Sequence, residues 1–455
     1  MVASVRMLGV IATLLLGTAV RAQEDGATPT PVPAAGQPVA PPSRQQFEWV
    51  SGIVGDLVGP ATLLERPYMT GDWGGLRTRL NKWGIYTNGA YVTDILGNPI
   101  GGEVQKVRYA HDVGLDLAID FERMLGWTGS RFQVSMSSRA GNDLSSDIGN
   151  VFTVAEVCCE FATRLVTLAW EQSLLEQRLS IRIGRLSTGD DFLTSPLYVL
   201  FVNSDFDANP FSPLLNTPYF AYPDATWGAR VRGRPVRPLY LAAGVYNANS
   251  DITRNSAHGV DMTFDGPGVL LTFEAGYEPA HHIKGMLPGH YKVGGYYDTS
   301  RYRRFGAPPD SDLPSDAEHG NGGYYFLADQ MVFREQGTQG LWPFLTVVVA
   351  PNQAINTMPL FLGGGLTYQG LLPGRDADVA LLGLAYGGFS RDLRRSQAGS
   401  PTGQQDFEMV LEWAYIIQIT PWLNVQPDFQ FILKPGGTGK IPDALVVGAQ
   451  IAVSL

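Results

Sequence analysis

The chain has 455 residues, of which 44% are hydrophobic, 17% charged and 11% aromatic, with 53 glycines, 31 prolines and 2 cysteines. This composition is too apolar for a disordered chain, and after residue 22 no run approaches the roughly 18 apolar residues of a spanning helix, which excludes helical transporters and channels. The net charge of −10 excludes the basic surface typical of nucleic-acid binders, and two cysteines are too few to staple a fold of this size.

The first 22 residues have the pattern of a secretory signal peptide. Arg6 precedes an apolar stretch from Met7 to Leu16, and small residues lead up to Ala22, after which we expect cleavage. An anchoring helix is the alternative, but the stretch is too short to span a membrane. Removing Arg6 and Arg21 leaves 31 basic and 43 acidic residues, so the mature chain would carry a net charge of −12.

Three segments follow the signal peptide. Residues 23–44 are rich in proline and are expected to form a disordered linker that stays extended and buries nothing. Apolar residues from Phe47 to Val58 recur at helical spacing, which predicts a short helix within residues 45–66. Residues 67–455 are assigned to one domain.

Within that domain, apolar residues recur at every second position in segments of about ten residues, which is the period of a sheet with two different faces. In residues 111–123, the odd-numbered residues from Val113 to Phe121 are apolar, whereas Asp112, Asp116, Asp120 and Glu122 lie on the opposite face. Sixteen strands are predicted, at residues 85–97, 111–123, 130–139, 164–174, 178–186, 226–234, 239–248, 268–278, 289–299, 323–334, 341–350, 360–370, 378–389, 407–419, 423–433 and 444–455.

The connections between these segments mostly alternate between long and short, as in residues 140–163, 187–225, 249–267 and 300–322 against 175–177, 235–238 and 420–422. Such alternation is typical of an outer-membrane barrel, whose closed sheet leaves no strand edge in lipid. A soluble sandwich also has alternating faces. The connections favour an all-β, sixteen-stranded antiparallel transmembrane β-barrel with a short N-terminal periplasmic helix, wide enough for an aqueous channel.

The segment before the first strand resembles a known family. Thr70-Gly71-Asp72-Trp73-Gly74-Gly75-Leu76-Arg77 is similar to the opening motif of the carbohydrate-selective porin family, OprB type, of Gram-negative outer membranes. Residues 426–431, 435–437, 443–444 and 447–448 resemble the closing strands of that family. Between the two ends the resemblance is one of pattern and length. It implies an integral porin of the Gram-negative outer membrane, with small neutral carbohydrates and membrane lipid as partners.

Three positions depart from the family pattern. Outer-membrane barrels commonly finish on an aromatic residue, whereas the last residue here is Leu455. Lys434 stands where asparagine is expected, and Gln450 where arginine is frequent. These departures concern local assembly and the charge of the lumen rather than the fold.

If the apolar faces contact lipid, the opposite faces line the pore. Carboxylates accept hydrogen bonds from sugar hydroxyls and guanidinium groups donate to them, so a lumen with both charges suits a neutral polyol. Transport requires such contacts to be weak and repeated. The alternative is a structural ladder of charges that holds the wall. The pore-lining candidates are Trp73, Arg77, Asp112, Asp116, Asp120, Arg131, Arg139, Arg182, Arg230, Arg232, Glu408, Glu412 and Asp428.

The connection 187–225 is unusually long and contains Asp190, Asp191, Asp205 and Asp207. Two arrangements are open: the connection folds inward and narrows the channel, or it caps the surface.

Other signals are weak. Cys158 and Cys159 form either a strained vicinal disulfide or a free pair, without a third ligand for a metal. His281 and His282 are interpreted as a solvated pair. Residues 436–440 resemble a phosphate-binding loop only superficially, and no enzyme motif was found.

The sequence therefore predicts a porin for facilitated diffusion of monosaccharides and similar small polyols, with no enzymatic activity, cofactor, metal or nucleic-acid partner. A homo-oligomer is left open. One alternative is a general or ion-selective porin. The other is a secreted all-β binding or structural protein, which would extract without detergent.

Overall fold

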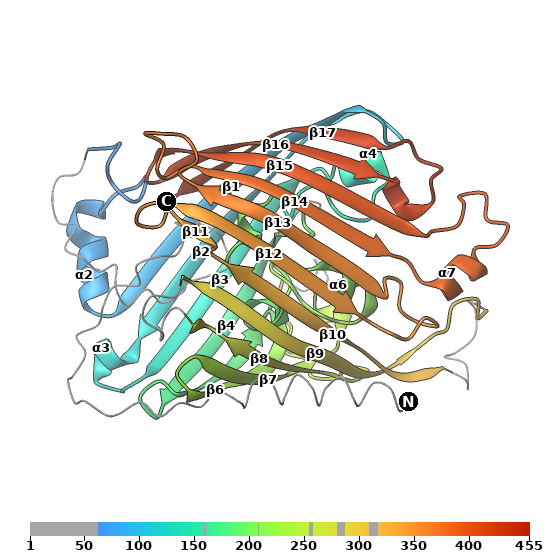
Figure 1. Ribbon diagram of the computed structural model, residues 1–455. Coiled ribbons are helices and arrows are strands. Elements are labelled where there is room, and N and C mark those ends of the chain that lie inside the picture. The colour runs from blue at the N-terminus through green and yellow to red at the C-terminus, as the bar shows by residue number, and fades with distance from the viewer. Residues whose placement is uncertain (1–61, 158–160, 208, 254–257, 280–286, 309–316) are drawn as a thin grey trace. The chain divides into compact units, whose positions relative to one another are not determined.

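The structure, a computed structural model, describes residues 62–455 apart from 158–160, 208, 254–257, 280–286 and 309–316 (Figure 1). Its strands form one antiparallel sheet that closes on itself, because β1 pairs with β2 on one side and with β17 on the other. The predicted signal peptide and linker, the cysteine pair and the histidine pair lie outside the described residues.

Seventeen strands are labelled, but β11 is a two-residue continuation that pairs with β12 beyond the end of β10, so sixteen long strands make the barrel. The strands are β1 (Ile85–Ile100), β2 (Val107–Asp120), β3 (Ser130–Gly141), β4 (Ala162–Leu174), β5 (Leu179–Leu186), β6 (Thr226–Val236), β7 (Leu239–Asn247), β8 (Val269–Tyr277), β9 (Gly289–Tyr302), β10 (Glu318–Gln330), β11 (Phe333–Arg334), β12 (Gly340–Val349), β13 (Leu360–Gln369), β14 (Val379–Gly388), β15 (Phe407–Thr420), β16 (Leu423–Leu433) and β17 (Ala444–Ser454).

The helices are short and lie between strands or before β1. They are η1 (Trp73–Gly75), α2 (Leu76–Lys82), α3 (Phe121–Leu125), α4 (Ser145–Ile148), α5 (Thr188–Asp191), η2 (Tyr198–Leu200), α6 (Phe211–Asn216), η3 (Ser250–Thr253), α7 (Arg391–Ser396) and η6 (Pro435–Gly437). None of the helices that the structure describes has the length and apolarity needed to cross a membrane.

The family-like motif before β1 folds as a tight turn into α2. Gly74 and Gly75 have φ angles of +67° and +92°, a backbone conformation that glycine adopts without the steric cost of a Cβ. Asp72 accepts hydrogen bonds from the N–H and the hydroxyl of Thr78 through Oδ1, at 2.8 and 2.9 Å. The motif is therefore a structural device that starts α2.

Each of the sixteen predicted strands is present, and the closed antiparallel barrel is confirmed. One local prediction was wrong. The strand predicted over 111–123 ends at Asp120, because the carboxylate of Asp120 caps the first turn of α3 by accepting from the N–H groups of Glu122 and Arg123. The apolar stripe from Phe47 to Val58, on which the predicted helix within 45–66 depends, lies outside the described residues, so that helix stays a prediction.

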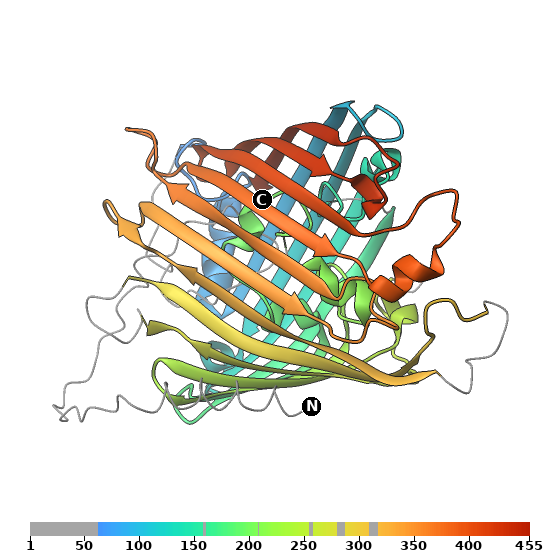
Figure 2. The ribbon, with the colours of Figure 1, turned by 45° about the vertical axis from the view of Figure 1, so that its right-hand side comes forward.

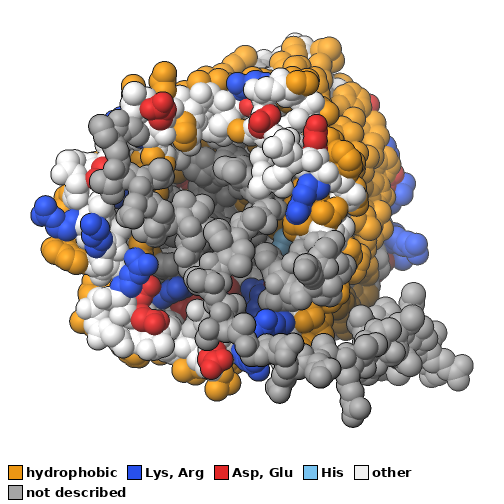
Figure 3. All heavy atoms as spheres, turned by 60° about the vertical axis from the view of Figure 1, so that its left-hand side comes forward, with side chains coloured by type: hydrophobic (Ala, Val, Ile, Leu, Met, Phe, Trp, Pro, Cys, Tyr) orange, Lys and Arg blue, Asp and Glu red, His pale blue; other side chains and the backbone are white. Residues whose placement is uncertain are grey.

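The two faces of the wall have the predicted orientation. Leu115 and Trp413 are 53% and 55% exposed on the outside, whereas Asp112 and Glu408, on the other parity, are buried inside. Hydrophobic side chains cover the visible part of the outer wall (Figure 3). Because the alternation persists around the sheet, the barrel presents an apolar surface to lipid and a polar one to its interior.

The long connections lie at one end of the barrel and the short turns at the other. Residues 187–225, here named the inner loop, leave the wall after β5, cross the interior with α5, η2 and α6, and return at β6; Figure 2 shows these green segments within the ring of strands. Buried side chains of this loop, including Phe192, Leu197 and Phe201, form the hydrophobic core with the inner faces of the strands. The core therefore sits inside the barrel.

Candidate functional site

The inner loop is tied to the barrel wall by buried carboxylates. Glu412, on β15, accepts hydrogen bonds from the main-chain N–H groups of Val202 at 2.8 Å and Asn203 at 3.1 Å. On the far side of the lumen, Glu274 on β8 accepts one from the N–H of Leu193 at 3.0 Å. Both carboxylates are buried, and a buried main-chain N–H without an acceptor is costly, so these hydrogen bonds anchor the loop at two distant points of the wall.

Glu408 anchors a second inward connection, residues 142–161. It accepts hydrogen bonds from the main-chain N–H groups of Val151 at 2.9 Å and Phe152 at 2.7 Å, and from that of Gly436 at 2.6 Å. Glu408 and Glu412 lie on the same face of β15 and both are fully buried. One strand thus holds both connections in place.

Aromatic rings fill the space between the inner loop and the strands from β10 onward. Phe201 and Phe206 pack on Phe344 of β12, with ring centroids 5.5 and 6.2 Å apart. Phe152 packs edge-on against Phe361 of β13 at 6.1 Å. This half of the interior is consequently a packed core, whereas Asp116, Arg131, Gln133 and Glu171, on β2 to β4, are only half-buried.

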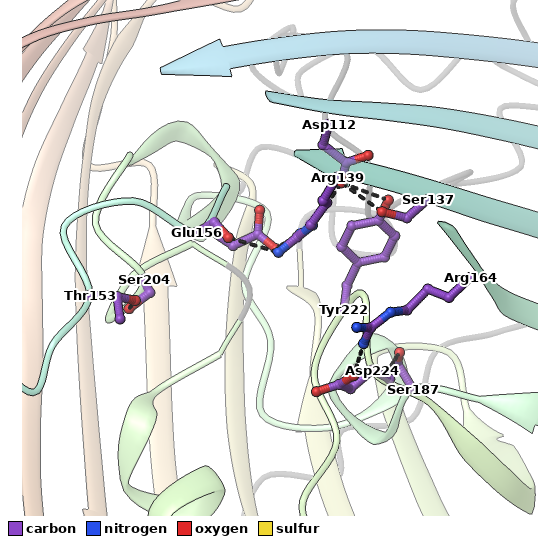
Figure 4. Close-up of polar contacts among 10 residues, drawn as sticks. All are labelled: Asp112, Ser137, Arg139, Thr153, Glu156, Arg164, Ser187, Ser204, Tyr222 and Asp224. Carbon is purple, nitrogen blue, oxygen red and sulfur yellow. Dashed lines mark hydrogen bonds and ion pairs between the residues drawn. The ribbon is translucent and has the colours of Figure 1, made fainter. Parts of the chain in front are cut away.

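A buried ion network joins the inward connections to β2, β3 and β4 (Figure 4). Arg139 donates from Nε to Oδ2 of Asp112 at 2.9 Å and pairs through Nη2 with Glu156 of the 142–161 connection. Arg164 pairs with Asp224 near the end of the inner loop. The side chains of Arg139, Asp112 and Glu156 are almost inaccessible, so this triad fixes the connections rather than binding solutes.

Five charged side chains form one row across the inner wall. Asp120, Arg131, Glu171, Arg182 and Arg230 are successive register partners on β2, β3, β4, β5 and β6. Their signs alternate until the two adjacent arginines. We name this set the charged row. Cross-strand neighbours of opposite charge stabilise the pairing of strands, so the row is also part of the wall.

Asp191 of the inner loop docks on the two arginines of the charged row. Arg230 donates from Nε to Oδ1 of Asp191 at 3.0 Å, and Arg182 donates from Nη1 to Oδ2 at 3.4 Å. Arg182 also donates to Gln133 at 2.9 Å, and Arg230 to Glu171 at 3.3 Å. Burial alone would raise the pKa of Asp191, but the charges of Arg230 and Arg182 lower it, so this carboxylate stays ionised.

The pKa of the neighbouring Asp190 is shifted in the opposite direction. Burial, opposed by Arg182 and assisted by Asp191 and Asp116, raises the pKa of Asp190 to about 7. Asp116 and Asp190 are half-buried, and their carboxylates accept no hydrogen bond from any residue that the structure describes. Their oxygens are therefore available to hydroxyl groups of a solute beside the charged row.

A second basic pair lies at the short-turn end of the barrel. Arg232 and Arg234 donate to the two carboxylate oxygens of Glu278 at 3.0 and 2.7 Å, and Arg232 stacks 3.7 Å above the ring of Tyr240. Burial acts to raise the pKa of Glu278, but the two guanidinium groups lower it to about 2. Arg232 is thus on the inner wall, held away from the charged row by its own partners.

Trp73 and Arg77 are not on the inner face of a strand. The guanidinium of Arg77 lies between the rings of Tyr68 and Trp73, 3.8 and 4.4 Å from their centroids. Its Nη2 donates to the main-chain oxygen of Leu455 at 2.9 Å. We name this arrangement the Arg77 clasp; it joins the segment before β1 to the residue after β17, where the barrel closes.

The structure thus separates the thirteen predicted pore-lining residues into groups. Asp116, Arg131, Arg182 and Arg230 lie together, beside Asp190 and Asp191. Other protein groups cover or engage the remaining nine: Asp112, Arg139, Glu408, Glu412 and Asp428 are buried under the inward connections, Asp120 caps α3, Arg232 pairs with Glu278, and Trp73 and Arg77 form the clasp.

Sequence reasoning missed Gln133 and Glu171 as members of this site. Both were detectable, because Gln133 has the parity of Arg131 on β3, and Glu171 lies within a predicted strand. Glu156 also acts as an anchor, and no local pattern marks it. Among the residues the structure describes, no group of three or more His, Cys, Asp or Glu side chains is placed to hold a metal ion.

A closed barrel of sixteen long strands, apolar outside and charged inside, with a loop folded into its lumen, defines an outer-membrane porin. Residues 104–455 match the model of the family described as "Carbohydrate-selective porin, OprB family". The chain therefore belongs to the carbohydrate-selective porin, OprB family, and is an outer-membrane channel of Gram-negative type. Members of this family are channels rather than enzymes.

Similar proteins agree with this assignment. Porin B of Pseudomonas aeruginosa is 28% identical over 415 residues, which cover 84% of this chain and 90% of that protein. A putative porin QuiX of Acinetobacter baylyi is 23% identical, over 86% of this chain and 93% of its own. The high-pH structure of Pseudomonas putida OprB superposes with a TM-score of 0.80 at 26% identity, covering 87% of this chain and all of that one.

Proposed function

We propose that this porin admits monosaccharides and similar small polyols by facilitated diffusion, and that solutes contact Asp116, Asp190, Arg131, Arg182 and Arg230. One observation carries the proposal. The inner loop brings Asp190 and Asp191 against the charged row, so that acids of the loop and bases of the wall lie together.

The charge arrangement supports a neutral solute. Asp191 and Glu171 together offset the charges of Arg182 and Arg230, which leaves no strong field of either sign beside Asp116 and Asp190. Carboxylate oxygens accept from sugar hydroxyls, and guanidinium groups with spare N–H donors give to them. Each such contact exchanges with water at little net gain, so a polyol binds weakly and leaves again.

Liposome swelling tests the proposal with sugars and charged solutes of matched size. We expect glucose to enter faster than a sugar acid or an amino sugar of the same size, and to compete with ion current in a planar bilayer. The double variant Asp116→Asn, Asp190→Asn is expected to weaken that competition several-fold. Asp265→Asn, on an exposed outer connection, is the control and should behave as the unaltered chain.

Entry of charged solutes at the rate of glucose would show a general or ion-selective porin instead. Loss of competition in the Asp265→Asn control would show that the carboxylates act through overall charge and not by contact. The homo-oligomer, the signal peptide and the N-terminal linker stay predictions from the sequence.

A further inference from the structure

The barrel wall has a gap where the inner loop begins. The register pairing of β4 with β5 reaches Leu168 and Arg185, and the chain then turns inward after Leu186. The part of β4 from Ala162 to Thr167 consequently has no β5 partner. Unpaired main-chain groups are not tolerated against lipid, so this edge needs another partner or protection from the membrane.

Residues 258–264, here named the wall segment, supply that partner from the connection between β7 and β8. The N–H of Leu165 donates to the main-chain oxygen of His258 at 2.9 Å. The ring Nδ1 of His258 donates to the main-chain oxygen of Thr163 at 2.9 Å. The wall segment therefore begins with a residue that binds the main chain of β4 at the edge that β5 leaves open.

The wall segment lies against the outside of the barrel. Trp227 is the register partner of Arg185 and alternates with the inward Arg230, so its indole points outward. Its Nε1 donates to the main-chain oxygen of Asp261 at 2.8 Å, and its ring packs against Phe264 with centroids 5.7 Å apart. The connection from β7 thus crosses the outer face of β6 to reach β4.

The same crossing covers an outward-facing charge. Arg185 lies on the outer face of β5, yet it is only 1% exposed and donates from Nε to the main-chain oxygen of Leu165 at 3.0 Å. Asp224 and Asp261 are among the charges that act on its guanidinium. A charged side chain on the lipid face is costly when bare, and here it is enclosed and hydrogen-bonded to the main chain of β4.

Three large apolar side chains face away from the barrel on the wall segment. Val260, Met262 and Phe264 occupy alternate positions and are 62%, 64% and 72% exposed. They lie beyond β5, which has 8 residues and is the shortest of the sixteen long strands. At about 3.3 Å per residue and a tilt of about 40°, such a strand rises only about 20 Å, less than the apolar band of about 25 Å.

We propose that the wall segment is an accessory part of the membrane-facing wall, with Val260, Met262 and Phe264 in contact with the acyl chains of the outer leaflet. The segment supplies apolar surface where the strands are too short, pairs the open edge of β4 and shields Arg185. This role concerns the seating of the barrel in lipid and is independent of which solute passes through it.

The test attaches an environment-sensitive fluorophore to Met262→Cys in the full chain carrying Cys158→Ser and Cys159→Ser. The protein is reconstituted in phosphatidylcholine vesicles with brominated acyl chains, and then in ordinary vesicles with aqueous iodide. Leu241→Cys on the outer face of β7 is the lipid-facing control, and Ala398→Cys on the exposed connection after α7 is the aqueous control. Heat-modifiable migration confirms that each variant is folded.

We expect emission at position 262 to be lost with brominated lipid, as at position 241, and to be unaffected by iodide. Quenching by iodide as strong as at position 398 would overturn the proposal in favour of a loop in water. Protection from both quenchers, together with disulfide-linked dimers of Met262→Cys, would overturn it in favour of a contact with a second copy of the chain.

Discussion

The carboxylate of Glu412 accepts a hydrogen bond at 2.8 Å from the main-chain N–H of Val202, a residue 210 positions earlier in the chain. Glu412 is fully buried, and its second oxygen accepts from Asn203. Neither N–H group has access to water at this place. One side chain of a distant strand thus supplies the acceptors for two buried main-chain groups of the inner loop.

Replacement of Glu412 with alanine is expected to widen the channel. It leaves the two N–H groups without their acceptor, at a cost of about 1–3 kcal/mol each, so the loop moves away from β15. Single-channel conductance should rise, and sugars larger than a disaccharide should begin to enter liposomes. Glu412→Gln keeps one acceptor oxygen and should show a smaller change. An unaltered size limit in the alanine variant would contradict this role.

Arg139 is expected to be important for stability. Replacement with alanine leaves Asp112 and Glu156 buried without their cation, and breaking a buried pair costs about 3–5 kcal/mol. Denaturant unfolding in detergent micelles measures the free energy of unfolding. The matched control is Arg395→Ala, whose pair with Asp392 is exposed and worth about 0–1 kcal/mol. Equal losses in the two variants would argue against a structural triad.

Ion selectivity should change with pH through Asp190. Its pKa is raised to about 7, chiefly by burial, so it gains a proton and loses its negative charge as the pH falls through that value. The permeability of cations relative to anions should therefore decrease between about pH 8 and 6. Reversal potentials in a salt gradient measure the ratio. Asp190→Asn is expected to diminish the step, and a step of equal size in that variant would assign it to another group, such as the neighbouring Asp116.

The Arg77 clasp is expected to stabilise the closure of the barrel. Arg77→Ala removes the stacking on two rings, at about 0.5–2 kcal/mol, and one hydrogen bond of about 1 kcal/mol to Leu455. The temperature at which the folded form converts to the slower-migrating unfolded form on gels should fall. Arg79→Ala changes an exposed arginine of the same helix and should leave that temperature unaltered; a matching decrease there would contradict the clasp.

The barrel was predictable from the sequence because every long strand repeats the same simple pattern. Successive side chains of a strand point to opposite faces. The alternation alone therefore assigns Leu115 to the outer face and Asp112 to the inner face, without knowledge of the residues that contact them. The same rule placed Arg182 and Arg230 on the inner wall. It also predicted an orientation for Glu122 that is wrong, because Asp120 ends the strand with a helix cap.

The alternation could not predict which inward-facing side chains the inner loop covers. By parity, Glu412 and Arg182 are equivalent inward-facing charges, yet one is enclosed by the inner loop and the other lies beside Asp116. What separates them is contact with residues far away in the chain, such as Val202 for Glu412. No local pattern carries that information, which is why the inward arrangement of residues 187–225 was only one of two open alternatives.

Leu186 and Thr226, the residues at which the inner loop leaves and rejoins the wall, are register partners on β5 and β6. The sheet therefore stays continuous across the base of the insertion, whatever the number of residues between them. Substitutions, deletions or duplications within the insertion can alter the aperture while the circumference of the cylinder and its seat in the bilayer remain the same. Porins with this architecture can therefore evolve a different solute selectivity through mutations confined to the inner loop.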